Sequence, residues 1–203
     1  AWQARWIGSN VRSNPQLFPL DGAQWIWNTA NAPRDAIAAG KLYFRKTVRV
    51  DASRRLKKAQ FGFTADKQAR LYCNGVLAGT CSAWQSGCLV SLLDYLQPGD
   101  NLLAVEGNNL FEGYAGFAGK LVLEYEDGQT QVLLTDPSWK TSPQAGDGWM
   151  LPGYDDASWG RPDQALPFGC SPWEEAAVHT APVEPAPAPV FRREFTLGGD
   201  IAR

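Results

Sequence analysis

The sequence predicts an all-β protein, an antiparallel β-sandwich of the jelly-roll type. Strand-like segments recur along the chain, at residues 41–50, 57–65, 69–73, 101–107, 119–126 and 129–134. Turn signals separate several of them, namely Asn74-Gly75, Pro98-Gly99-Asp100 and Asp127-Gly128. No long stretch has the 3.6-residue period of a helix, and only residues 90–101 could hold one helical turn. Many strands with polar turns and few helices are typical of a sandwich.

Residues 62–75, GFTADKQARLYCNG, carry this pattern together with a polar interruption. Apolar residues alternate from Phe61 to Ala65, three polar residues follow at 66–68, and the alternation resumes up to Cys73. Asn74-Gly75 then supplies the pair that tolerates positive φ in a tight hairpin turn. We therefore predict two strands joined at a corner that holds an acid, a base and an amide. These three side chains are either solvated loop residues or part of a binding site.

The bulk composition is that of an ordinary globular domain. The 203 residues are 44% hydrophobic and 20% charged, with a net charge of −2, which gives no reason to expect nucleic acid or an anionic membrane as a partner. No apolar run approaches the ~20 residues that span a bilayer. Nine Trp, nine Phe and six Tyr are many for this length. Most of them belong in the core, but aromatic faces also stack well on sugar rings.

Four cysteines stand at positions 73, 81, 88 and 170. Cys81 and Cys88 flank six residues, a spacing that a disulfide could close, although sequence alone cannot fix the pairing. Cys73 lies on an alternating segment, and we expect it to be a buried thiol. None of the four shows the CxxC spacing of a zinc site.

The chain divides into three parts. Residues 1–178 contain all the strand signals and form the predicted sandwich domain. Residues 179–190, rich in Pro and Ala, are expected to be an extended, semi-rigid linker. Residues 191–203 read as the first strand of a truncated following domain. We therefore expect the chain to be a piece of a larger protein.

Catalytic chemistry finds little support in the residues. The single histidine, His179, stands beside the Pro-rich segment, which excludes a serine or cysteine triad and histidine-rich metal sites. Paired carboxylates occur at Glu124 and Glu126 and at Asp155-Asp156. Their simplest interpretations are a solvated strand end and a helix cap, since glycoside hydrolysis needs two carboxyls that face each other. We do not expect this chain to be an enzyme.

Several stretches together resemble a known group of modules. They are KLYFRKTVRV, FTADKQARLYCNGVLAGT, LQPGDNLLAVEGNN, AGFAGKLVLEYEDG, SWKTS and PGYDDASWG. This set is similar to the galactose-binding-domain-like jelly rolls attached to bacterial and fungal α-L-rhamnosidases, in particular the calcium-dependent modules that bind L-rhamnose. The resemblance covers about residues 2–175. The later stretch APVFRREFTL resembles the opening strand of the β-sandwich that follows in those enzymes.

The resemblance implies a sugar site at the corner between the two strands, with a bound Ca²⁺ that coordinates sugar hydroxyls. At that corner Asp66 is kept, but Lys67 stands where the resemblance leads us to expect an amide oxygen. An ammonium donates hydrogen bonds and cannot ligate Ca²⁺. Gln68 could take over the missing role, or Lys67 could bond the sugar or a neighbouring uronate directly. Asp66 and Asn109 are the implied metal ligands.

A second loop, after the strand at 101–107, is implied to carry further ligands. It maps onto Asn108, Asn109, Glu112 and Tyr114, although turn chemistry also explains the asparagine pair. Trp84 lies where a loop could cover the apolar face of the sugar; its alternative is an aromatic that only packs in the core or against a loop.

The resemblance implies a non-catalytic carbohydrate-binding module of a rhamnosidase-type glycoside hydrolase. Its partners would be L-rhamnose or a rhamnose-containing polysaccharide and the catalytic domain of the parent enzyme. Such a module is expected outside the cell or in the periplasm, and as a monomer when excised. An alternative is a structural ancillary sandwich that packs on the catalytic domain without binding sugar. A third alternative, cleavage of glycosidic bonds by the sandwich itself, needs the facing carboxylate pair.

Overall fold

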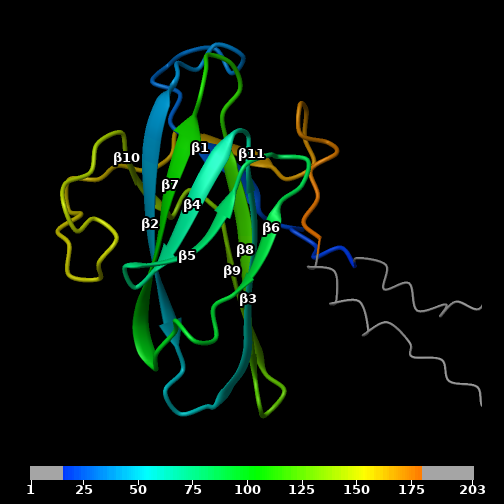
Figure 1. The fold of residues 1–203 in the computed structure, drawn as a ribbon, viewed down its shortest axis with the longest axis vertical. Coiled ribbons are helices and arrows are strands. Elements are labelled where there is room, and N and C mark those ends of the chain that lie inside the picture. The colour runs from blue at the N-terminus through cyan, green and yellow to red at the C-terminus, as the bar shows by residue number, and fades with distance from the viewer. Residues whose placement is uncertain (1–15, 180–203) are drawn as a thin grey trace, which may run out of the picture.

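Two antiparallel β-sheets lie face to face in the computed structural model, which describes residues 16–179 (Figure 1). The predicted all-β sandwich is confirmed. No helix occurs among these residues, so none of them forms a helix that could cross a membrane. Residues 90–101 contain only an isolated turn, in which the Leu96 amide donates to the Leu92 carbonyl at 3.1 Å.

One sheet has six strands and the other has five. The first contains β1 (Gln24–Trp27), β3 (Leu56–Ala65), β6 (Cys88–Ser91), β8 (Phe117–Tyr125), β9 (Thr130–Leu134) and β11 (Gln164–Pro167), in the order β11-β1-β8-β3-β6 with β9 paired to β8. The second contains β2 (Gly40–Val50), β4 (Gln68–Cys73), β5 (Val76–Cys81), β7 (Gly99–Asn109) and β10 (Lys140–Ser142), in the order β10-β2-β7-β4-β5. Strand β7 is central in the second sheet and pairs with β2 and β4.

All six predicted strands are present, with ends within two residues of those expected. The five that the sequence analysis did not name, β1, β5, β6, β10 and β11, are only three to six residues long. Strands this short show at most a few alternations. The predicted linker and following strand lie outside the described residues, apart from His179. This exposed residue forms an isolated antiparallel β-bridge with Leu17. Those two domain assignments stay predictions.

The core fills the space between the sheets with aromatic and aliphatic side chains. Phe44 of β2, Phe61 of β3 and Phe117 of β8 are fully buried, and the rings of Phe44 and Phe117 lie 5.3 Å apart. Leu103 and Val105 of β7 lie in the same sheet as Phe44 and join this core from that side. Each such side chain stabilises the fold by about 1.5–3 kcal/mol relative to leaving it exposed.

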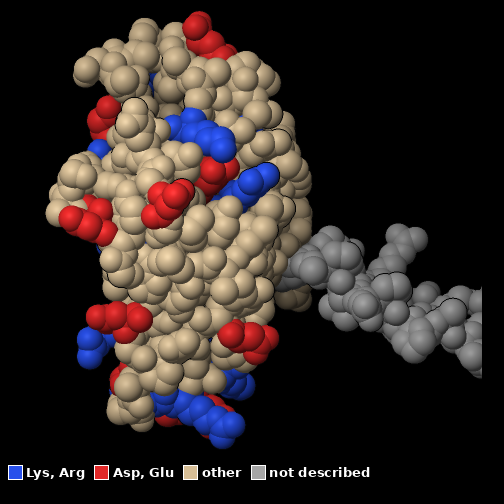
Figure 2. All heavy atoms as spheres, turned by 60° about the vertical axis from the view of Figure 1, so that its left-hand side comes forward, with Lys and Arg blue, Asp and Glu red and all other residues tan. Residues whose placement is uncertain are grey.

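Charged side chains of both signs are interspersed over the face seen in Figure 2, and neither sign forms a continuous patch there. Ion pairs also link β3, or the residue before it, with β8 or the residue after it. Examples are Lys58 with Glu124 at 3.4 Å and Arg55 with Glu126 at 3.3 Å. The Glu124 and Glu126 side chains are both partly exposed. The expected solvated strand end therefore fits both carboxylates.

Part of the outer face of the five-stranded sheet is covered by the segment 143–160. Its Trp149 packs against Tyr43 and Tyr72, with ring centroids 4.9 and 5.6 Å away. Arg45, on the same face of β2, holds the segment down. Its guanidinium, only 3% exposed, donates to the Trp149 carbonyl and, through Nε, to Asp156 Oδ2 at 2.8 Å.

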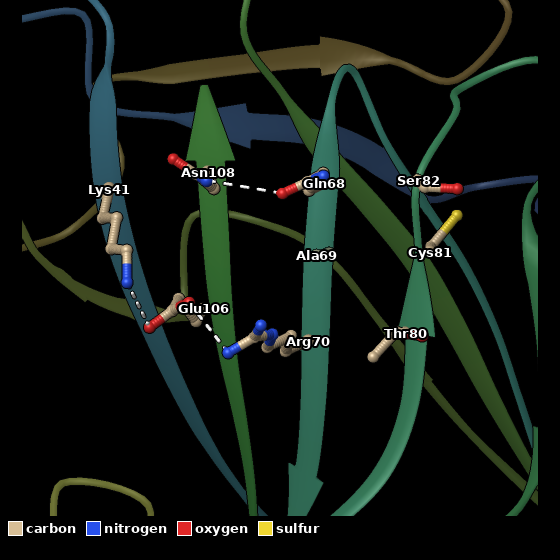
Figure 3. A pocket seen from close by; sticks show the side chains of 9 residues that line it. All are labelled: Lys41, Gln68, Ala69, Arg70, Thr80, Cys81, Ser82, Glu106 and Asn108. Carbon is tan, nitrogen blue, oxygen red and sulfur yellow. Dashed lines mark hydrogen bonds and ion pairs between the residues drawn. The ribbon is translucent and has the colours of Figure 1, made fainter. Parts of the chain in front are cut away.

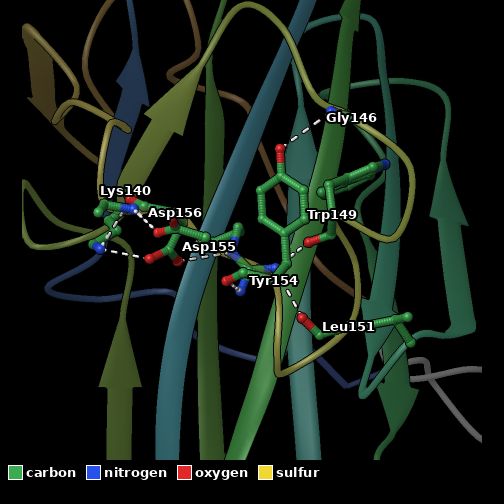
Figure 4. A network of polar contacts seen from close by, with 9 residues as sticks. Lys140, Gly146, Trp149, Leu151, Tyr154, Asp155 and Asp156 are labelled. Carbon is green, nitrogen blue, oxygen red and sulfur yellow. Dashed lines mark hydrogen bonds and ion pairs between the residues drawn. The ribbon is translucent and has the colours of Figure 1, made fainter.

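Asp156 receives two cations at once. The Lys140 ammonium donates to its Oδ1 at 2.6 Å (Figure 4), while Arg45 binds the other oxygen. No helix follows Asp156, so the expected helix cap is wrong there. Its partly buried carboxylate instead pairs with Arg45 and Lys140. Its neighbour Asp155 accepts from the Ala157 amide at 3.0 Å, which is local turn chemistry.

Asp156→Asn is expected to lower the free energy of unfolding at neutral pH by about 1.5–3 kcal/mol, because Arg45 keeps a buried charge without a carboxylate partner. Burial alone would raise the pKa of Asp156, but the hydrogen bonds from Lys140 and Arg45 outweigh it and hold that pKa below its usual value. The stabilisation is thus present above the unfolded-state pKa of about 3.9 and is lost as the pH falls through the folded-state value.

Urea titrations across this pH range would measure the effect. The difference between wild type and Asp156→Asn should shrink on acidification. Glu124→Gln, which breaks an exposed pair, is the matched control and should cost less than about 1 kcal/mol. Equal urea midpoints for wild type and Asp156→Asn at neutral pH would contradict this account of the clamp.

Candidate functional site

The candidate site lies at the end of the sandwich where β7 finishes and where β2 and β4 begin. Gly40 pairs with Asn109, and Gln68 pairs with Asn108, so these strand ends are level with one another. The loops 28–39 and 110–116 extend beyond them, at the top of Figure 1. The corner at Asp66-Lys67 joins β3 to β4 at this same end. The fold therefore brings the two loops singled out in the sequence to one place.

Asp66 is a buried carboxylate, only 6% exposed. The Trp173 indole nitrogen donates a hydrogen bond to its Oδ1 at 2.8 Å, and the Asp66 amide donates to the Gly116 carbonyl at 2.9 Å. Trp173 is itself fully buried and stacks on Trp25, with centroids 4.5 Å apart. The corner acid is therefore fixed from beneath by an aromatic pair.

Trp173 is the residue that sequence reasoning missed. It lies 107 positions beyond Asp66, in the irregular segment after β11 and outside every alternating stretch. Tyr114, one of the expected loop residues, packs edge-on against it at 6.0 Å. The only available signal was the excess of tryptophans over what a core needs.

Lys67 folds back onto its neighbour. Its ammonium nitrogen lies 2.7 Å from Asp66 Oδ2, although the angles there are not those of a hydrogen bond, so the contact is an ion pair. The same nitrogen lies 4.6 Å from the centre of the Phe111 ring, a cation–π arrangement. Lys67 is thus held between a buried acid and an exposed aromatic.

Asn109 points inward from the last position of β7. Its amide nitrogen donates to the carbonyls of Ile37 and Ala38, at 3.2 and 3.1 Å. Its Oδ1 is buried without a hydrogen-bond partner. Asn109, Asp66 and Lys67 line one narrow crevice that has no room for a water molecule. We call Asp66, Lys67, Asn109 and Trp173 the end site.

Two of the expected residues face elsewhere. Successive side chains of a strand point to opposite faces of the sheet, so Asn108 and Gln68 project onto the outer face of the five-stranded sheet (Figure 3). There the Asn108 amide nitrogen donates to Gln68 Oε1 at 3.4 Å. These two side chains line a groove of about 300 Å³.

The groove is polar, and ion pairs form part of its lining. Glu106, mostly buried, lies 3.2 Å from the Lys41 ammonium and 4.0 Å from the Arg70 guanidinium (Figure 3). Thr80 and Ser82 add hydroxyl groups at its edge. Such a set of donors and acceptors suits a polyhydroxylated ligand.

The remaining expected residues lie around the end site in different roles. Trp84 is half-buried against the cluster of Trp25 and Trp173, and its carbonyl accepts from the Thr64 hydroxyl at 3.1 Å. It therefore packs beneath the loops in this conformation. Glu112 and Tyr114 are exposed on the loop 110–116.

The cysteines are all free thiols in this structure. The Cys81 thiol donates to the carbonyls of Ala83 and Ser86 and the Cys88 thiol to that of Thr80, and the two do not form the disulfide that their spacing allows. Cys73 is buried as expected, and burial raises its pKa to about 12. It is chemically inert at neutral pH.

The end site is a poor fit for Ca²⁺ as its side chains stand. Calcium takes six to eight oxygen ligands, whereas the crevice offers one carboxylate, whose second oxygen already contacts an ammonium. Across residues 16–179 no group of three or more His, Cys, Asp or Glu side chains comes together to hold a metal. With Lys67 in place, the Asp66–Asn109 pair lacks both the space and the charge for this ion.

The fold defines the class, an antiparallel β-sandwich, and a lectin is among the proteins that share it. No family model matches the chain. The lectin of Pleurotus ostreatus, solved in complex with GalNAc, superposes with a TM-score of 0.69 and 27% identity over 81% of this chain and 50% of the lectin.

The second comparison is more specific. An α-L-rhamnosidase of Streptomyces avermitilis is 30% identical over an alignment of 203 positions, which covers 97% of this chain and 19% of the relative. Its crystal structure, complexed with L-rhamnose, superposes with a TM-score of 0.75 and 28% identity over 88% of this chain. The chain is homologous to a segment of that α-L-rhamnosidase, which confirms the resemblance. It spans about a fifth of that relative's length.

A double-mutant cycle should detect the Trp173–Asp66 hydrogen bond. Trp173→Phe and Asp66→Ala, which removes the acceptor, should each destabilise the domain in urea titrations, with a coupling energy of about 0.5–3 kcal/mol between them. Trp25 offers a matched control, because its indole nitrogen is buried in the same cluster without a partner. Trp25→Phe and Asp66→Ala should be nearly additive. Equal coupling in both cycles would show that the effect comes from ring packing instead.

Proposed function

We propose that this domain is a non-catalytic carbohydrate-binding module that binds L-rhamnose, or glycans that contain it, at the end site. The observation that carries the proposal is the buried Asp66 carboxylate, which Trp173 and Lys67 hold at the loop end of a lectin-like sandwich. The homologous rhamnosidase, whose crystal structure is complexed with L-rhamnose, supports the choice of sugar.

The rim of the end site offers what a 6-deoxy sugar needs. Phe111 is 59% exposed and Tyr114 is 37% exposed, and Leu110 stands beside them. These side chains can cover the methyl group and the C–H face of the sugar, a contact that favours aromatic surfaces. The Lys67 ammonium, 21% exposed, supplies donors to vicinal hydroxyls from the same rim.

A longer glycan would continue from the rim into the groove of Figure 3. Gln68 begins β4 beside the corner, and its partner Asn108 is the residue before the end of β7, so the groove adjoins the end site. The Arg70 guanidinium is more than half exposed there and makes only one long ion-pair contact. Its remaining donors suit a second sugar unit.

In the parent protein the module would tether a catalytic domain to rhamnose-containing polysaccharide. Tethering raises the effective concentration of substrate without a change in the chemistry, so weak affinity is sufficient. This role belongs outside the cell or in the periplasm, and the isolated domain would act as a monomer.

An ancillary structural role is the second candidate. Val76 and Leu77, at the β4–β5 turn, are about half exposed, and Leu151 packs against this turn at Gly75 while also staying half exposed. These three apolar side chains offer a docking surface for another domain at some distance from the end site. A domain that only packs there would not respond to sugar.

Calorimetric titration of the folded domain with L-rhamnose should give saturable heat. Phe111→Ala, on the exposed rim, should weaken binding by about threefold to tenfold while leaving the fold intact. Val132→Ala is the matched control, since Val132 is similarly exposed but lies on β9. No heat from a folded domain, at concentrations that detect millimolar affinity, would favour the structural role. Equal losses in both variants would place the sugar elsewhere.

A further inference from the structure

The Asp66 carboxylate needs a positive charge close by, because burial of an unpaired carboxylate is costly. Trp173 supplies a neutral donor to one oxygen, at 2.8 Å. The other oxygen lies 2.7 Å from the Lys67 ammonium. Among the side chains that line the crevice, Lys67 is the only cation. The charge of the end site is therefore balanced from within the chain.

A second buried oxygen lines the same crevice and lacks a hydrogen-bond donor. Asn109 is 2% exposed, and its Oδ1 has no hydrogen-bond partner. The amide cannot turn over without cost, since its nitrogen donates to the carbonyls of Ile37 and Ala38. Asp66 Oδ2 and Asn109 Oδ1 are thus two buried, hydrogen-bond-free oxygens in one crevice, and this pattern suits a cation.

The Lys67 side chain lines this crevice, and one side of it is exposed to solvent. No water molecule fits in the crevice beside it, so a metal ion could enter only if the lysine left. Phe111 holds the ammonium from above at 4.6 Å. The side chain is still 21% exposed, which leaves donors free for a ligand at the rim.

We propose that the Lys67 ammonium is the fixed cation of the end site and that sugar binding here is independent of Ca²⁺ and other divalent ions. This inference rests on the proposed sugar-binding function. The ammonium neutralises Asp66 and donates its free N–H groups to vicinal hydroxyls, so one side chain supplies both the charge and the direct contact.

Four proteins test the proposal: wild type, Lys67→Asn, Lys67→Met and Lys67→Arg. The asparagine variant removes the charge and adds an amide oxygen beside Asp66 and Asn109. The methionine variant keeps a long apolar chain against Phe111 without charge. The arginine variant restores charge and donors. Each is freed of metal with EGTA, and its melting temperature is measured with and without CaCl₂.

The melting temperature of the wild type should not respond to CaCl₂. On addition of CaCl₂, the melting temperature of Lys67→Asn should rise by about 2–4 °C or more, because the bound ion stabilises the folded state. This readout involves no sugar. A wild type that CaCl₂ stabilises would overturn the proposal, whatever the result with sugar, and so would a Lys67→Asn variant that shows no gain.

Calorimetry with L-rhamnose then tests the role of the ammonium in binding. Wild-type affinity should agree within about twofold in EGTA and in CaCl₂. Lys67→Met should lose about tenfold or more in both, and Lys67→Arg should recover most of it. Loss of wild-type binding in EGTA, or full affinity in Lys67→Met, would overturn the proposal. If the wild type binds no rhamnose in either buffer, the sugar function fails, and the melting temperatures still decide whether Lys67 replaces a metal.

Discussion

The eleven-residue pairing of β2 with β7 fixes most of this domain. It runs from Gly40 opposite Asn109 to Val50 opposite Gly99 without a register shift. Alternation along β7 then divides its side chains among four environments. Leu103 and Val105 enter the core, whereas Leu102 and Ala104 carry the covering segment 143–160. At its end, Glu106 and Asn108 face the groove and Asn109 enters the end site. A slip of one residue would exchange all of these roles.

Buried charge is handled in the same way at two places in the fold. Arg45 beneath the covering segment and Asp66 at the loop end are both almost inaccessible, and each has an oppositely charged partner and an aromatic neighbour. Both partners are partly exposed, but the partner of Arg45 is a carboxylate that Lys140 also binds, whereas the partner of Asp66 is an ammonium. The first arrangement is therefore structural. The second leaves donors that a ligand can use.

The sequence could predict what depends on local alternation. The six long strands, the hairpin at Asn74-Gly75 and the polar corner at 66–68 all follow from the two-residue period and turn chemistry. Alternation could also have separated Asn108 from Asn109, since neighbours on a strand face opposite ways. Trp173 was beyond reach, because its bond to Asp66 joins segments 107 positions apart and no local pattern marks it. The return of Lys67 onto Asp66, and the loss of the helix cap at Asp156, likewise depend on tertiary packing.

The central claim is that sugar binds at the end of the sandwich, above the Asp66–Trp173 hydrogen bond. Proton–nitrogen NMR of the tryptophan indoles tests it most directly, with the Trp173 signal identified by its loss in Trp173→Phe. During titration with L-rhamnose the Trp173 indole signal should move saturably, because this indole N–H donates its hydrogen bond to the Asp66 carboxylate. The signal of Trp149, which belongs to the covering segment on the outer face of the five-stranded sheet, should stay in place. A stationary Trp173 signal, with shifts confined to other tryptophans or absent, would contradict the account.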